Sequence, residues 1–303
     1  MKLVTYSHAD RLSIGVINKD YVIDLSRHAP QLPRTMRELL EAGQDALNIV
    51  AAILAAGHKD IPLSELTLEA PIPNPRKFLG IGGNTHSHLE EVKAAGVPIK
   101  HSPHQTWFNK QVSCINGPFG NLHLPKISAE LDYEGELAVV IGQRCRHVPR
   151  EDAYNVIAGY MVCNDVSVRD WQLRSPTSTL GKSFDTHGPT GPWLTTRDEV
   201  PDPHRLSLKT WVNGELRMDG RSDEFLHNID TMIAELSTVF TLEPGDILAT
   251  GSPAGVGALM TPPAFLRSGD VVRVEVEGLG AIENKVLDEP DGYVYVPLLS
   301  SDG

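Results

Sequence analysis

The chain has 303 residues, of which 41% are hydrophobic and 22% are charged, with 26 glycines and 22 prolines. This composition is typical of a soluble globular protein and excludes a disordered or fibrous one. Twenty-seven Lys and Arg against 39 Asp and Glu give a formal charge of −12, which repels polyanions, so we expect no nucleic-acid partner.

The sequence shows no secretion signal and no membrane-spanning segment. Its start, Met-Lys-Leu-Val-Thr-Tyr, lacks a signal-peptide pattern, and the longest apolar run, residues 47–57, is too short to cross a bilayer. Cys114, Cys145 and Cys163 are widely spaced without a CxxC pair, which predicts neither a disulfide framework nor a thiolate zinc site. We therefore expect a cytoplasmic protein without a membrane partner.

The first part of the chain predicts a small N-terminal α+β domain over residues 1–70. β-prone runs that read as strands occupy Lys2–Tyr6, Ser13–Ile17 and Tyr21–Asp24. Apolar residues then recur near the helical period, which predicts one helix from about Thr35 to Ala56, with Gly57 as its stop.

A proline-rich stretch marks the expected domain boundary. The segment Glu69-Ala-Pro-Ile-Pro-Asn-Pro-Arg76 contains three prolines within five residues, a composition that breaks regular structure. We expect the main domain to begin near Pro71 and to cover residues 71–303.

The main domain is expected to contain more strand than helix. Asn213-Gly214 indicates a hairpin turn, residues 226–239 show helical periodicity, and the segment Gly188-Pro-Thr-Gly-Pro192 is rich in turn residues. No regular βαβ alternation occurs, so a β-rich α+β fold is favoured over a doubly wound sheet. The predicted strands are Lys77–Ile81, Leu137–Ile141, Ala158–Cys163, Ser207–Val212, Asp246–Thr250 and Val271–Val276.

Three short motifs resemble known functional signatures but are incomplete. Residues 80–85 lack the third glycine of a dinucleotide fingerprint, and Pro176 stands where a phosphate-binding loop ending at Lys182 needs its first glycine. Ser252 follows Gly251 directly, which excludes a GxSxG nucleophile elbow. Nucleotide binding and serine hydrolysis are therefore not predicted.

A carboxylate pair is the first candidate for chemistry. Glu134 and Glu136 are two residues apart, so in a strand both point to the same face of the sheet. Asp165 ends a buried apolar run and is the candidate for a third ligand of a hard divalent ion such as Mg²⁺. The alternative is a solvated strand face with an unrelated acid.

A histidine and a glutamate form a second candidate. His88 and Glu91 are three residues apart, the spacing at which helical side chains share a face and a carboxylate can orient an imidazole. Such a pair could deprotonate water. His86 is a competing histidine, and the alternative is an exposed helix face without a catalytic role.

Several polar groups could bind an anionic substrate. Arg169 and Gln172 are three apart, and Lys110 and Lys182 lie in separate polar segments. The glycines after Thr250 would let backbone N–H groups approach an anion or oxyanion closely, although a tight connecting turn explains them equally well.

Taken together, these segments resemble the fumarylacetoacetate hydrolase family, in order from about Lys77 to Val286. No single motif is specific, but seven occur in sequence. They are the Asn-x-x-x-His-x-x-Glu run at 84–91, Phe108-Asn-Lys110, Asp132-Tyr-Glu-Gly-Glu136-Leu, Asn164-Asp165 with Arg169 and Gln172, Gly181-Lys182 with Asp185 and Gly188-Pro-x-Gly-Pro192, Val212-Asn-Gly-Glu215, and Thr250-Gly-Ser-Pro-x-Gly-Val-Gly257.

The resemblance implies a catalytic domain built on a mixed β-roll that forms a homodimer. It implies Mg²⁺ or Mn²⁺ bound by the acidic triad of Glu134, Glu136 and Asp165, with His88 and Glu91 as the water-activating pair. Thr85 stands where the family commonly has Tyr, and Met218 stands where it often has Gln. These two departures concern the substrate pocket and leave the acidic triad unchanged.

The expected activity is metal-dependent hydrolysis of a C–C bond in a 2,4-dioxo acid, such as an acylpyruvate. In this hypothesis His88, oriented by Glu91, activates water, and Lys182 and the Thr250 loop offset charge on the substrate oxygens. The same residues could serve a 2-oxo diacid decarboxylase or a keto–enol isomerase. A non-catalytic protein that binds a metal or a small acid is the alternative from another class.

Overall fold

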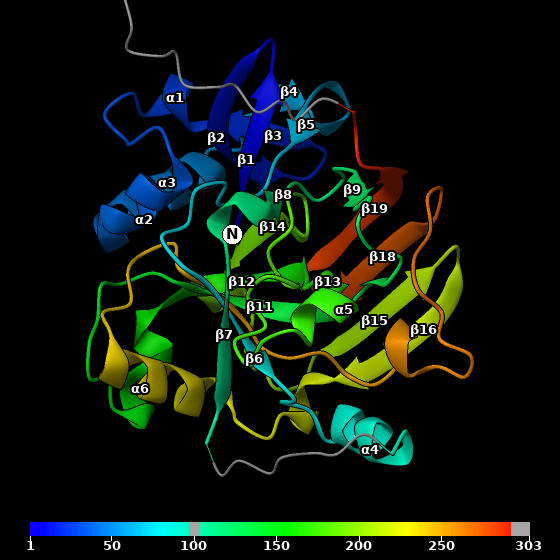
Figure 1. The fold of residues 1–303 in the computed structure, drawn as a ribbon. Coiled ribbons are helices and arrows are strands. Elements are labelled where there is room, and N and C mark those ends of the chain that lie inside the picture. The colour runs from blue at the N-terminus through cyan, green and yellow to red at the C-terminus, as the bar shows by residue number, and fades with distance from the viewer. Residues whose placement is uncertain (97–103, 292–303) are drawn as a thin grey trace, which may run out of the picture.

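The computed structural model describes residues 1–96 and 104–291, so residues 292–303 of the predicted main domain lie outside the described residues. The N-terminal segment contains a group of short strands and three helices at one end of the molecule, opposite to helix α4 (His86–Ala94) (Figure 1). These elements are β1 (Lys2–His8), β2 (Arg11–Asn18), β3 (Tyr21–Asp24), α1 (Leu25–His28), α2 (Met36–Glu41), α3 (Gly43–Ala55), β4 (Ile61–Pro62) and β5 (Thr67–Leu68).

The largest sheet has twelve strands in the order β4-β3-β2-β1-β14-β12-β11-β17-β6-β7, with β5 and β8 attached to β1 and β14. Most pairs are antiparallel, but β17 and β6 are parallel, which makes the sheet mixed. The strands not yet given are β6 (Phe78–Gly82), β7 (Thr106–Lys110), β8 (Ile115–Asn116), β11 (Gly135–Ile141), β12 (Ile157–Asn164), β14 (Gly188–Thr196) and β17 (Ile247–Ala249).

A second sheet of five strands packs against the first, in the order β16-β15-β18-β19-β9. Strands β15, β18 and β19, which lie on one side of Figure 1, contact β11, β12 and β14 of the large sheet. Buried side chains from both sheets form one core. The elements are β9 (Leu122–Leu124), β15 (Ser207–Val212), β16 (Glu215–Arg221), α6 (Ile229–Val239), β18 (Val271–Val276) and β19 (Gly280–Asp288), together with the separate pair β10 (Leu131–Asp132) and β13 (Ser167–Val168), and helix α5 (Arg169–Gln172).

The central strands β11 and β12 are buried on both faces, which explains their nearly continuous apolar sequences. Every residue of β11 is buried, and Leu137 to Ile141 have no exposed surface. The strands predicted from the sequence are all present, as is the hairpin turn at Asn213-Gly214, where both residues have positive φ. The predicted β-rich mixed fold is therefore confirmed.

One prediction of local structure was wrong, and one segment rich in turn residues forms a strand. The single helix predicted from about Thr35 to Ala56 is two helices, because Gly43 has a φ of 75°, which ends α2 and lets α3 start in a new direction. The turn-rich segment 188–192 is the start of strand β14. The prolines at 189 and 192 donate no backbone hydrogen bond, and the ladder of β14 with β12 shifts register between Gly191 and Thr195, where the strand accommodates Pro192.

The N-terminal strands continue the large sheet. Strand β1 pairs with β14 through Lys2 opposite Thr195 and Leu3 opposite Leu194. Leu3 and Leu194 are both fully buried and belong to the same core cluster as α2 and α3. The predicted boundary near Pro71 remains a prediction. Within the described residues, no helix is long and apolar enough to span a membrane.

We predict that Leu194→Ala lowers the free energy of unfolding by about 2–5 kcal/mol, because it opens a cavity where β14 meets β1. The control Leu216→Ala removes a side chain of a residue that is 44% exposed, and should change stability by less than about 0.5 kcal/mol. Denaturant unfolding followed by circular dichroism measures both values. Equal stability of the two variants would contradict the packing described for this junction.

Candidate active site

Strands β11 and β12 bring the three predicted metal ligands together. Gly135 lies opposite Asn164, so the residues that flank this pair, Glu134 and Asp165, are neighbours. The backbone N–H of Asp165 donates to the carbonyl of Glu134 over 2.8 Å. One carboxylate oxygen from each of Glu134, Glu136 and Asp165 lies within 4.8 Å of the other two, and all three residues are buried. Carboxylate oxygens this close together could hold one shared cation.

Two buried lysines bind this triad directly. The Lys182 Nζ donates to Glu134 Oε2 and to Asp165 Oδ2, each over 2.7 Å. The Lys110 Nζ donates to Asp165 Oδ1 over 2.6 Å and to the carbonyl of Val166 over 3.2 Å. The structure therefore brings both predicted cations to the carboxylates, where they offset negative charge.

Arg169 and Gln172 lie on the single turn of helix α5 and face the same way, as their spacing predicts. The Arg169 guanidinium donates from Nη1 to Glu134 Oε1 and, over 2.9 Å, to Gln172 Oε1. Its Nε donates to Asp132 Oδ2 over 2.8 Å. Arg169 therefore links a predicted metal ligand to a second carboxylate that is fully buried.

The charges around the triad do not balance. Four buried carboxylates, those of Asp132, Glu134, Glu136 and Asp165, face three buried cations, those of Lys110, Arg169 and Lys182. Among the described residues, the Glu136 carboxylate forms no ion pair, and its hydrogen bond comes from the Gly251 N–H over 2.7 Å. One carboxylate is thus left without a positive partner.

Burial and the neighbouring charges shift the pKa values of Glu134 and Glu136 in opposite directions. Burial alone would raise the pKa of Glu134, but the charges of Lys182 and Arg169 outweigh it and lower that pKa to about 2. For Glu136, burial and then the charges of Asp165 and Glu134 hold the pKa well above the usual carboxyl range. A divalent cation with oxygen ligands, such as Mg²⁺ or Mn²⁺, would supply the missing charge. The donor set fits such an ion.

The predicted His–Glu pair is formed on helix α4, which is capped by the Thr85 side chain at its N-terminus. His88 Nδ1 lies 3.0 Å from Glu91 Oε2, and the two side chains are 18% and 19% exposed. The other carboxylate oxygen, Glu91 Oε1, accepts the Gly255 N–H over 2.9 Å. His86 is exposed and does not line the site, whereas His88 does. This arrangement favours His88 over His86.

The glycine-rich loop after β17 binds carboxylates of the protein itself. Gly251 and Gly255 donate to Glu136 and Glu91, so one loop bonds both to the acidic triad and to the His–Glu pair. Gly255 has a φ of 115°, and a Cβ there would lie 2.0 Å from the carbonyl oxygen of Arg217, so only glycine fits. The Thr250 hydroxyl donates to the Leu137 carbonyl over 2.8 Å, and its role toward a substrate stays a prediction.

A cavity of about 120 Å³ joins these groups. Predicted site residues that line it are His88, Glu134, Glu136, Arg169, Gln172 and Lys182. Four predicted site residues do not line it. Glu91 bonds to His88 and Asp165 bonds to Lys182, both of which line the cavity, whereas Lys110 bonds to Asp165 and Thr250 to a backbone carbonyl. Sequence reasoning assigned no role to the other walls, which come from Trp107, Phe108, Pro176, Ser178 and Ser252 among others, because apolar and hydroxyl side chains carry no distinctive spacing signal.

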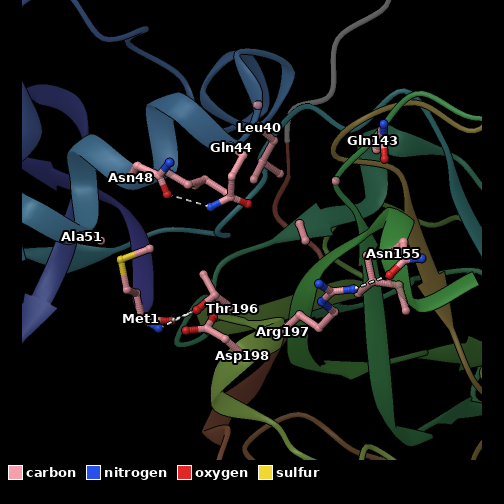
Figure 2. Close-up of a pocket in the computed structure, with 15 residues that line it drawn as sticks. Met1, Leu40, Gln44, Asn48, Ala51, Gln143, Asn155, Thr196, Arg197 and Asp198 are labelled. Carbon is pink, nitrogen blue, oxygen red and sulfur yellow. Dashed lines mark hydrogen bonds between the residues drawn. The ribbon is translucent and has the colours of Figure 1, made fainter. Parts of the chain in front are cut away.

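A larger cavity of about 520 Å³ lies between helices α2 and α3 and the ends of β12 and β14 (Figure 2). Its polar side chains bond to one another, as Gln44 does to Asn48 over 3.0 Å and Arg197 to Asn155 over 3.4 Å. None of the predicted catalytic or ligand residues lines it. The smaller cavity, where the carboxylates and the imidazole meet, is therefore the candidate active site.

Two further residues hold the site. In the sequence, Asn84 was noted only as part of a motif, and Thr85 only as a departure from the family pattern. Asn84 donates from Nδ2 to the Thr250 carbonyl over 2.8 Å and accepts the His227 N–H over 2.8 Å, which joins the start of α4 to the glycine-rich loop. Thr85 donates to the Ser252 carbonyl over 2.7 Å. At this position, where Tyr is common in the family that the sequence resembles, the chain therefore has a buried hydroxyl that anchors α4.

The chain is similar to known proteins over most of its length. The family model described as the C-terminal domain of fumarylacetoacetate hydrolase matches residues 77–287. The chain is 40% identical over 293 residues to the mitochondrial oxaloacetate tautomerase fahd2 of Xenopus laevis, a match that covers 95% of this chain and 90% of the relative.

Two solved structures share the fold over their whole length. One is the maleylpyruvate hydrolase of Sphingobium sp. SYK-6 in complex with manganese(II) and pyruvate, with 32% identity, a TM-score of 0.80, and coverage of 96% of this chain and 100% of that one. The other is the 5-carboxymethyl-2-hydroxymuconate delta-isomerase of Mycobacterium smegmatis, with 31% identity, a TM-score of 0.75, and coverage of 96% and 100%. Both reaction types, hydrolysis and isomerisation, thus occur on this fold.

We predict that Glu136→Gln stabilises the metal-free protein above the usual carboxyl pH range. The pKa of Glu136 is higher in the folded state than in the unfolded state. The stability of the wild type therefore falls as the pH rises from the unfolded pKa to the folded pKa, and it is unaffected by this group at lower pH, where the carboxyl is protonated in both states. In EDTA the variant should therefore exceed the wild type in unfolding free energy at pH 8 and match it near pH 3.5. Thermal unfolding across this pH range measures the difference.

The same variant should lose its response to metal. Mn²⁺ at about 100 times its dissociation constant stabilises a protein that binds it by about 2.7 kcal/mol, and we expect this gain in the wild type but not in Glu136→Gln. Glu151→Gln, a substitution at an exposed glutamate, serves as the control and should behave like the wild type. A full Mn²⁺ response in Glu136→Gln would remove this residue from the metal site.

Proposed function

The chain belongs to the fumarylacetoacetate hydrolase family, and on that premise we propose that it is a divalent-metal-dependent tautomerase of a short 2-oxo diacid such as oxaloacetate. The 40% identity to an oxaloacetate tautomerase over nearly the full length of both chains supports this reaction. C–C hydrolysis, the reaction that the sequence motifs favour, is the second candidate.

One observation carries the proposal: His88 lines the same cavity as Glu134 and Glu136. An acid–base group and a cluster that fits a divalent cation therefore face one small volume. Keto–enol interconversion needs these two elements, a group that moves the proton on carbon and a positive charge near the carbonyl oxygen.

When bound by Glu134, Glu136 and Asp165, the cation would supply the positive charge that favours a negative oxygen at C2 of the substrate. Within the chain, Glu91 accepts a hydrogen bond from His88 Nδ1, so the other ring nitrogen, Nε2, is free to act as a base. His88 Nε2 removes a proton from C3 of the keto form and returns it in the reverse direction.

Lys182 is a hydrogen-bond donor in this scheme and not a base. Burial would lower its pKa, but the charges of Asp165 and Glu134 more than compensate and raise it, so the ammonium stays protonated. An ammonium has three N–H groups, and the bonds to Glu134 and Asp165 use two of them. The third can donate to the C2 oxygen as that oxygen gains charge.

The charge of the site favours an anionic substrate. Four carboxylates and three cations leave one excess negative charge, and a divalent ion would reverse its sign. A cavity of about 120 Å³ suits an acid of a few carbon atoms. These two properties support a short 2-oxo acid over a bulky or neutral substrate.

Hydrolysis of a 2,4-dioxo acid is supported by the likeness to a maleylpyruvate hydrolase, at a TM-score of 0.80. In that reaction His88 would take the proton from a water molecule that attacks C4, and the C3–C4 bond would break. The products are a 2-oxo acid and a second carboxylic acid. The two candidate reactions differ in whether His88 deprotonates carbon or water.

We predict that His88→Ala lowers turnover of the wild-type substrate by about 10²- to 10⁴-fold, the range for loss of a general base, while Mn²⁺ affinity stays within about threefold. His86→Ala is the matched control, since His86 lies on the same helix but is exposed. Its activity should equal that of the wild type. Full activity in His88→Ala, or a loss in His86→Ala instead, would contradict the assignment of the base.

A substrate panel separates the reactions. With Mg²⁺ or Mn²⁺, we expect faster decay of the enol absorbance of oxaloacetate, without CO₂ release and without a second acid. Acylpyruvates tested in parallel should be cleaved slowly or not at all. Release of a second acid supports the hydrolase instead, CO₂ release from oxaloacetate supports a decarboxylase, and Mn²⁺ binding without any turnover supports a non-catalytic binding protein.

A further inference from the structure

Asp132, the last residue of β10, is a fully buried carboxylate that the proposed mechanism does not use. It is not among the three carboxylates that lie within 4.8 Å of one another, and it does not line the cavity. Its burial would be costly unless its oxygens were fully bonded.

Both oxygens of Asp132 are held by fixed donors. The Oδ1 atom accepts the N–H groups of Tyr133 over 2.9 Å and of Gly257 over 2.8 Å. The Oδ2 atom accepts the Ala258 N–H over 3.0 Å and the Arg169 Nε–H over 2.8 Å. Three backbone donors thus fix the carboxylate, and the fourth donor is a side chain that it can orient in turn.

Arg169 connects Asp132 to the acidic triad. Its planar guanidinium binds Asp132 on one side and Glu134 and Gln172 on the other, a geometry that a single ammonium group cannot reproduce. The position of the Glu134 carboxylate is therefore tied to that of Asp132, although the two side chains share no hydrogen bond that would link them directly.

We propose that Asp132 is a positioning residue, which holds Arg169 so that Glu134 presents its carboxylate to the divalent cation. This inference rests on the metal-dependent function proposed above. It assigns a role to the first residue of the Asp-Tyr-Glu-Gly-Glu segment, whose two glutamates provide predicted ligands.

The test measures the Mn²⁺ dissociation constant by electron paramagnetic resonance of the free ion. Asp132→Asn should weaken Mn²⁺ binding about 10- to 100-fold, the usual cost of losing a partner that orients a ligand. In a Glu134→Gln background the same substitution should change the constant by less than about threefold, because Arg169 then no longer positions a ligand carboxylate. Wild-type affinity in Asp132→Asn, or an equal loss in both backgrounds, overturns the proposal.

Asp170→Asn is the control for charge. It removes one negative charge from the residue next to Arg169, whose carboxylate bonds to Ser128 and to the Trp171 N–H instead of to the loop. Its Mn²⁺ affinity should stay within about threefold of the wild-type value. A loss as large as that of Asp132→Asn would show that charge alone, and not positioning, sets the affinity.

Arg169→Lys is the second variant, for the case that Asp132→Asn does not fold. It keeps the positive charge and leaves the three backbone bonds of Asp132 in place, but it cannot bridge Asp132 and Glu134 with a planar fork. We expect a 10- to 100-fold loss of Mn²⁺ affinity, and wild-type affinity would overturn the proposal. Failure of the proposed reaction would be seen separately, as absent turnover of oxaloacetate by a wild-type protein that still binds Mn²⁺.

Discussion

The structure depends on the burial of several carboxylates in one small volume. Asp132, Glu134, Glu136 and Asp165 are all buried at the ends of neighbouring strands, where an unpaired charge is costly. Two lysines and one arginine, also buried, offset most of this charge. The remaining excess falls on Glu136, whose pKa is raised by burial and then by the charges of Asp165 and Glu134, and this excess is the reason that the site fits a divalent cation.

The glycine-rich loop of residues 251–258 connects the parts of the site. Its backbone N–H groups bind Glu136, Glu91 and Asp132, which come from β11, α4 and β10. A backbone donor has no rotamers, so it fixes a carboxylate more rigidly than a long side chain does. The loop can approach these groups so closely because glycines occupy its tight positions, and the N–H groups of Gly251, Gly255 and Gly257 are thereby engaged with carboxylates of the protein.

The proposed reaction and its rival use the same charge distribution. Tautomerisation and C–C hydrolysis both place negative charge on the C2 oxygen of a 2-oxo acid, and both need a base beside it. The difference lies in what His88 meets in the cavity, a C3–H group or a water molecule. Which of the two His88 contacts depends on the shape of the cavity, whose walls include Trp107 and Phe108. The reaction is therefore selected by the fit of the substrate more than by the acid–base residues.

The sequence alone determined the strands and the local pairs. Alternating or continuous apolar runs predicted the central strands, and the spacings of His88 with Glu91 and of Arg169 with Gln172 correctly predicted shared helix faces, because the helix period is set by backbone geometry. Glu134, directly before β11, and Glu136 within it also have carboxylate oxygens close together, as their spacing predicted.

Tertiary structure decided which other residues these pairs contact. The pairing of β11 with β12 places Asp165 beside Glu134, and the packing of the glycine-rich loop on α4 turns donors that could face a substrate toward Glu91 and Glu136. The local pattern also did not predict that the helical region breaks at Gly43 or that the proline-containing segment 188–192 forms part of strand β14. Contacts between residues far apart in the chain depend on register and packing, which local periodicity does not encode.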